Sequence, residues 1–143
     1  MSALSLDHAR TILDAALKAG AEKGFKPLAI AVLDARGALK AFAAQDGTSL
    51  KRGEIARGKA DGALAMGLGS RALAAMAAER PAFVAAATHA VGGSLVPVPG
   101  GVLIRDGGAV VGAVGVSGDL SDNDEICAVA GIEAAGLKAD TGA

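Results

Sequence analysis

The sequence predicts one α/β domain, of the α+β type, in which helices pack on an antiparallel sheet. The order of elements is the first reason, because helical stretches surround two pairs of short apolar runs. Each pair is joined by a turn of only a few residues, which cannot connect parallel strands. Length is the second reason, since 143 residues match the usual size of one domain. We therefore expect a single domain over residues 1–143.

The first part of the chain predicts a helix and then a β-hairpin. Ser5 can cap a helix whose apolar positions recur every three or four residues, and Gly24 and Pro27 end it. Apolar runs over 28–33 and 39–44 flank a four-residue turn. This pattern is typical of two antiparallel strands.

The middle of the chain predicts three helices. The first covers residues 52–68 and contains glycines at positions 53, 58 and 62. Each interior glycine costs ~1 kcal/mol of helix stability relative to alanine, so these positions indicate a close approach of another backbone or of a ligand. Plain helix packing is the commoner explanation. Shorter helices are expected over 70–79 and 81–89, the second opened by Pro81.

A loop rich in glycine and proline, over 92–101, precedes a second predicted hairpin. Its strands cover 102–105 and 109–117, and an Asp-Gly-Gly turn joins them.

Four acidic residues gather at the start of the last predicted helix, which we expect to extend to position 137. Ser121 and Asp124 resemble a capping box. The spacing of a calcium loop is absent. Acidic groups near a helix N-terminus each stabilise it by ~0.3–1 kcal/mol, so helix capping explains the group better than a metal ion. The acidic residues are Asp119, Asp122, Asp124 and Glu125.

The composition favours self-association. Hydrophobic residues make up 52% of the chain and charged residues 20%, so an isolated chain would expose much apolar surface. We therefore expect a homo-oligomer.

Several partner classes are not expected. The net charge is -1, and neither a basic run nor an aromatic stacking platform is present, so we expect no nucleic-acid partner. Residues 82–104 carry no charge, but prolines and Gly-Gly pairs interrupt them, so we expect no membrane partner. The single cysteine, Cys127, and the lack of a signal-peptide pattern predict a cytoplasmic protein.

Two histidines and two basic residues are the candidates for chemistry. His89 ends a predicted helix just before the Gly/Pro loop, where an imidazole can face a pocket, although a helix C-terminal cation or a buried, satisfied group is the commoner role. His8 is expected at the surface of the first helix. Arg52 and Lys59 belong to a group of four cations within nine positions, which either meets a ligand carboxylate or forms a solvated helix face.

Four segments together resemble the GlcG/HbpS-like haem-binding, or haem-degrading, domain family, which also forms the C-terminal half of PduO-type proteins. They are a strand ending in Asp, a Lys-Ala helix, a Pro-Gly-Gly loop and a Gly-Ala-Val-Gly-Val-Ser-Gly run, at residues 28–37, 55–60, 97–104 and 110–118. The resemblance covers nearly the whole chain. It implies a profilin-like sandwich around a five-stranded antiparallel sheet, and a homo-oligomer that is a ring-like octamer in some members.

The resemblance also implies a small-ligand-binding protein whose ligand is haem. His89, or less readily His8, would approach the iron, and Arg52 or Lys59 would meet a propionate. Residues at positions of the family pattern are Lys59, Pro99, Gly100, Gly101 and Gly118, and we expect the first four of them at the ligand site.

Two further functions stay open. An enzyme of the lyase, isomerase or hydratase type would act on a small carboxylate or carbonyl compound, with Lys59 as electrophile or base. Backbone N–H groups of the Pro-Gly-Gly loop would then hold an oxyanion. An accessory oligomer without a ligand is the other possibility, and in it substitutions at Lys59 and His89 would change only stability.

Overall fold

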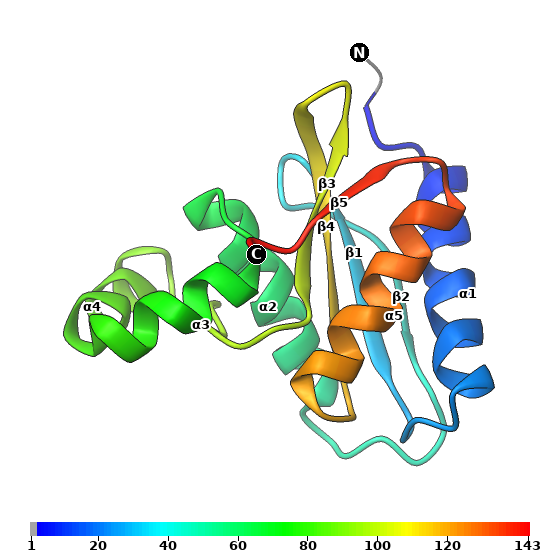
Figure 1. Ribbon diagram of the computed structural model, residues 1–143, viewed down its shortest axis with the longest axis horizontal. Coiled ribbons are helices and arrows are strands. Elements are labelled where there is room, and N and C mark those ends of the chain that lie inside the picture. The colour runs from blue at the N-terminus through cyan, green and yellow to red at the C-terminus, as the bar shows by residue number, and fades with distance from the viewer. Residues whose placement is uncertain (1–2) are drawn as a thin grey trace.

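A five-stranded antiparallel sheet with helices on both faces forms the centre of the computed structural model, which describes residues 3–143 (Figure 1). The strand order is β2-β1-β4-β3-β5, so the two hairpins meet along β1 and β4. This confirms the predicted fold class and the profilin-like sandwich. The helices are α1 (Leu6–Glu22), α2 (Arg52–Met66), α3 (Ser70–Glu79), α4 (Pro81–Ala90) and α5 (Ser121–Ala134). The strands are β1 (Ala29–Asp34), β2 (Leu39–Ala44), β3 (Gly101–Asp106), β4 (Ala109–Ser117) and β5 (Lys138–Asp140).

The C-terminal end differs from the prediction. The last helix ends at Ala134, before the predicted position 137, because Gly136 takes a left-handed backbone conformation with φ +75°. The chain then turns back, and Lys138 to Asp140 pair with β3 as the strand β5. A run of three residues with charges at both ends lacks the apolar alternation that identifies a strand in a sequence.

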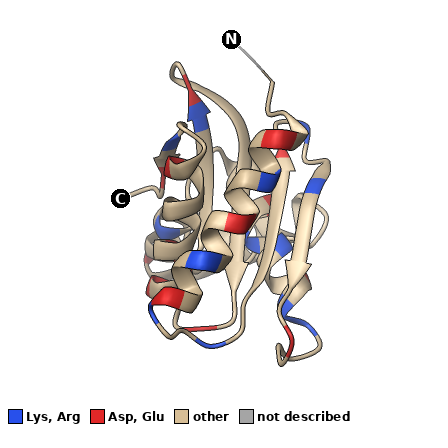
Figure 2. Cartoon of the chain, turned by 90° about the vertical axis from the view of Figure 1, so that its right-hand side faces the viewer, with Lys and Arg blue, Asp and Glu red and all other residues tan. Residues whose placement is uncertain are grey.

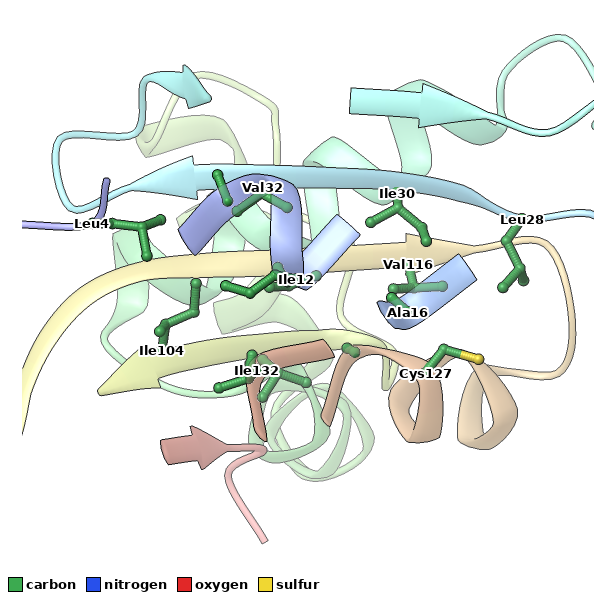
Figure 3. Packing of buried hydrophobic residues seen from close by; sticks show 14 of the residues in the cluster. Leu4, Ile12, Ala16, Leu28, Ile30, Val32, Ile104, Val116, Cys127 and Ile132 are labelled. Atoms are coloured by element: carbon green, nitrogen blue, oxygen red, sulfur yellow. The ribbon is translucent and has the colours of Figure 1, made fainter. Parts of the chain in front are cut away.

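One face of the sheet is covered by α1 and α5 (Figure 1). Alternate residues of the central strands, such as Ile30 and Val32, point into this layer and meet Ile12 of α1 and Ile132 of α5 (Figure 3). The two helices approach each other closely, because a Cβ at Gly131 would lie 2.5 Å from the carbonyl oxygen of Ile12. The larger hydrophobic core therefore lies on this side.

The opposite face is covered by α2, through small side chains. Ala60 and Ala63 pack on Leu33, and on Leu103 and Ala113 of the neighbouring strands. At one point the two backbones leave no room for any side chain, since a Cβ at Gly115 of β4 would lie only 1.8 Å from the carbonyl oxygen of Ala56. The alanine and glycine content thus allows a helix to lie unusually close to the sheet.

Helices α3 and α4 extend away from the sheet, and we call them the α3–α4 arm (Figure 1). Helix α4 packs mainly against α3 and contains no Lys, Arg, Asp or Glu, yet Val84 is its only buried side chain. Phe83 is 39% exposed, and the Arg80 guanidinium lies 4.3 Å from the centre of its ring. The arm therefore presents an apolar helix to its surroundings. Within residues 3–143, no helix is both long and apolar enough to cross a membrane.

The outer surface of α1 carries charges of alternating sign (Figure 2). Acidic and basic residues follow one another at a spacing of three or four, and Lys18 lies 3.8 Å from Glu22. This arrangement is typical of a solvated helix face.

Candidate functional site

The Gly/Pro loop before β3 crosses the outer side of α2 at two of the helix glycines. A Cβ at Gly58 would lie 2.7 Å from Val96, and one at Gly62 would lie 2.9 Å from Leu95. The backbone N–H of Val96 donates a hydrogen bond of 3.1 Å to the carbonyl of Gly58. The close approach predicted from the glycines therefore occurs, and the loop of the same chain makes it.

Lys59 lies beneath the end of this loop and is enclosed. Its side chain is 2% exposed, and its ammonium donates to the carbonyl of Val116 at 2.8 Å and to the carboxylate of Asp124 at 3.1 Å. Gly100, with φ +121°, covers it so closely that a Cβ there would lie 2.9 Å from Nζ. The structure thus brings together Lys59 and the Pro-Gly-Gly loop, as the resemblance implies. A catalytic role for Lys59 stays a prediction.

The sequence prediction missed Asp124 as the partner of Lys59. The proposed capping box is wrong, because Ser121 lies inside the helix and Leu120 is the N-cap residue, without a side-chain cap. One carboxylate oxygen of Asp124 accepts from the N–H of Asp119 at 3.0 Å, and the other accepts from Lys59. The available signal was helical spacing, which places Asp124 on the same side of α5 as the buried residues Cys127, Ala128 and Gly131.

Burial shifts both members of the pair. It lowers the pKa of Lys59 below its usual range and raises the pKa of Asp124 above its usual range, because each group has lost its contact with water. The attraction between the two charges opposes both shifts. Burying the Lys59–Asp124 pair therefore costs desolvation free energy. The two charges can stay buried because each neutralises the other.

Arg52 opens α2 at the end of the sheet where β4 finishes. Its guanidinium donates to the hydroxyl of Ser117 at 3.2 Å, and Ser117 itself is fully buried. Arg52 also lines a small hollow of about 200 Å³, which we call the Arg52 hollow. The rest of its lining comes from Lys26, Pro27, the loop 47–49 and Gly118.

Two larger hollows adjoin along the outer side of α2. The Phe42 hollow, of about 430 Å³, is lined by Leu39, Phe42, Gly53, Glu54, Arg57 and Ser94. The Val91 hollow, of about 410 Å³, is lined by the β1–β2 turn at 35–37, by Asp61, Leu64 and Ala65 of α2, and by Ser94 and Val91. Ser94 borders both, and its hydroxyl donates to Asp61 at 2.7 Å. Arg57 donates to the same carboxylate at 3.3 Å, so a polar bridge separates the mainly apolar Phe42 hollow from the more polar Val91 hollow.

The two histidines lie on opposite sides of the sheet. His89 is exposed near the end of α4, two residues before Val91 of the Val91 hollow. His8 is half-buried on α1, and among the residues from position 3 onward its enclosed Nδ1 has no hydrogen-bond partner. The structure does not bring His89 to the Lys59–Asp124 pair, whose polar partners are Val116 and Asp119.

The comparisons with known proteins agree with this architecture. A family model described as "Haem degrading protein HbpS-like" matches residues 4–133. The solved structure of HbpS is 28% identical, with a TM-score of 0.80, and 93% of this chain and 90% of that one are covered. The PduOC:heme complex is 23% identical, with a TM-score of 0.85 and coverage of 95% and 97%. Klebsiella pneumoniae protein ORFY is 20% identical, with a TM-score of 0.83 and coverage of 92% and 90%. A search of curated proteins finds no match.

Proposed function

Because this chain belongs to the family of HbpS-like haem-degrading proteins, we propose that it binds haem in the hollows along the outer side of α2. The family match over residues 4–133 is the observation that carries the proposal. The crystal structure of PduOC, which shares the fold, is a complex with heme, and this adds support from the architecture.

The size of the two hollows and the apolar lining of the Phe42 hollow suit a flat ring system with polar groups at one edge. Together they offer Leu39, Phe42, Leu64 and Val91 on one side of the molecule, and Leu39 and Phe42 are both nearly half exposed. Pockets of about 300–1,000 Å³ with few polar groups are typical of small-ligand sites. Arg57 lines the Phe42 hollow and, beyond its bonds to Asp61 and to the carbonyl of Gly37, keeps a further N–H donor group for a propionate. In this arrangement Arg57 takes the role that the sequence suggested for Arg52 or Lys59.

His89 is the histidine that we propose as the iron ligand. It lies two residues before Val91, which lines the Val91 hollow, on a helix without Lys, Arg, Asp or Glu, and within residues 3–143 its imidazole makes no hydrogen bond. An imidazole is a common protein ligand of haem iron. Bound haem would supply a redox-active iron, while the chain would supply the ligand, the apolar bed and the propionate partner.

A haemin titration of the purified apoprotein tests this proposal. The Soret band should saturate in wild type, while His89→Ala should weaken binding and change the spectrum. His8→Ala is the matched control, because it removes the only other histidine from the opposite side of the sheet and should bind as wild type does. Uptake that does not saturate, or that is identical in wild type and His89→Ala, would refute the proposed ligand.

We also infer that the chain forms a homo-oligomer. Large apolar side chains that an isolated chain leaves in water support this, including Leu50 at 88% exposure and Leu120 at 73%, together with the apolar α4. The resemblance adds that the oligomer is a ring-like octamer in some members. Analytical ultracentrifugation should give the mass of several chains, and eight if the octamer is formed. A single-chain mass at all concentrations would contradict the inference.

A further inference from the structure

We propose that the Arg52 hollow is a separate binding site for a small molecule bearing a carboxylate or a phosphate. The hollow lies between the start of α2, the segment Lys26-Pro27 and the loop 47–49. At about 200 Å³ it is too small for a tetrapyrrole and large enough for an anion of a few heavy atoms. The proposal therefore does not depend on haem binding.

The two cations of this hollow lack carboxylate partners. Within residues 3–143, no acidic oxygen lies within 4.0 Å of the side-chain nitrogens of Lys26 or Arg52, whereas Arg57 and Arg71 are both ion-paired. Arg52 is held by its hydrogen bond to the buried hydroxyl of Ser117, so its planar group is fixed rather than free. A guanidinium fixed in this way can still donate to two oxygens of one anion.

The carboxylate of Asp119, the residue after Gly118 of the lining, is already occupied by other donors. It accepts from the N–H groups of Lys26 and Leu120, each at 2.7 Å, and from the side chain of Asn123 at 2.8 Å. These bonds lower the pKa of Asp119 to about 2. The charge of Lys59, which lies close to Arg52, is balanced by Asp124. The net charge of the groups that line the hollow is therefore positive.

The rest of the lining adds uncharged donors and leaves room for a ligand. Within the described residues, the hydroxyls of Thr48 and Ser49 make no side-chain hydrogen bond near the hollow. A Cβ at Gly118, where φ is +152°, would lie 2.1 Å from the carbonyl oxygen of Pro27. The chain can close around the hollow only because this position has no side chain.

Amide chemical-shift titrations of the ¹⁵N-labelled apoprotein test the site, with pyruvate and inorganic phosphate as separate probes at constant ionic strength. We expect saturable shifts at residues 47–49 and 118. Arg52→Gln and Lys26→Gln should each weaken binding about tenfold, the scale of losing a charged hydrogen bond. Lys51→Gln is the matched control, because Lys51 is exposed and faces Glu54, and it should bind as wild type does.

The two probes and the variants separate the possible outcomes. Saturation by pyruvate alone identifies a carboxylate site, and saturation by phosphate alone identifies a phosphate site. Equal shifts in wild type, Arg52→Gln and Lys51→Gln would show general screening and overturn the proposal. The absence of saturable shifts, with haemin affinity reduced in Arg52→Gln, would assign Arg52 to a haem propionate and also overturn it. Thermal unfolding of each variant shows that it is folded before it is compared.

Discussion

Replacing Lys59 by methionine should strongly destabilise the protein. The substitution keeps the length of the side chain but leaves Asp124, which is 1% exposed, with a buried charge and only the N–H of Asp119 as its partner. Removing one member of a buried ion pair typically costs about 3–5 kcal/mol of unfolding free energy. Breaking an exposed ion pair costs only about 0–1 kcal/mol of unfolding free energy. Lys51→Met, which removes the exposed partner of Glu54, is therefore the control.

The pH dependence gives this prediction a second, independent readout. The ammonium of Lys59 lowers the pKa of Asp124, so the Lys59→Met variant should have an Asp124 pKa still further above the ordinary value of 3.8. A carboxyl group whose pKa is higher in the folded state than in the unfolded state stabilises the fold at a pH below its unfolded pKa. This contribution is lost as the pH rises through the pKa of the folded state. The stability deficit of Lys59→Met should therefore be smaller at a pH of about 4 than at about 8.

Urea unfolding followed by circular dichroism measures both effects, since the chain has no tryptophan or tyrosine for fluorescence. The double variant Lys59→Met, Asp124→Leu should recover most of the loss, because an apolar pair of similar volume replaces the two charges. A deficit below about 1 kcal/mol in Lys59→Met, or one that does not change with pH, would show that Asp124 does not carry an uncompensated buried charge in the variant.

Three further predictions follow from groups near the sheet. Gly115→Ala should cost about 3 kcal/mol in the same urea assay, the upper end for overpacking, because its Cβ would meet the carbonyl of Ala56 at 1.8 Å; a near-neutral result would show that α2 can move away. Burial raises the pKa of Cys127 to about 11, so a thiol reagent at a pH of about 8 should label it only after unfolding, and rapid labelling of native protein would be contrary to the structure. Asp119→Ala should be less stable than wild type at neutral pH, because the pKa of Asp119 is lowered to about 2. Since a lowered pKa contributes stability that is lost as the pH falls through it, this difference should disappear between a pH of about 4 and about 2; a difference that persists there would contradict the assignment.

Local sequence signals were sufficient to predict most of the fold. Short turns define both hairpins, α1 begins after its cap Ser5, and α4 begins at Pro81, as predicted. Strand β5 could not be predicted, because Lys138 to Asp140 become a strand only through pairing with Arg105 and its neighbours. That pairing depends on the tertiary fold and leaves no periodic pattern in the sequence.

The candidate sites were less predictable than the fold. Lys59 and Gly100 were recognised as important from the family pattern, but the partner Asp124 is 65 residues away from Lys59 and resembled a helix cap. The Arg52 hollow joins three segments that are distant in the sequence. Sites of this kind arise from juxtaposition, which residue types and spacing alone do not encode.

The isolation of α4 has a consequence for amide hydrogen exchange. Because this helix packs mainly against α3, its hydrogen bonds can open without disturbing the sheet, and its amides should exchange far faster than those of β1 and β4. Any molecule that seats on α4, whether haem beside His89 or a second chain on Phe83, would have to stabilise the closed helix. Slower exchange confined to α4 would therefore report binding at the arm even when no other part of the protein changes.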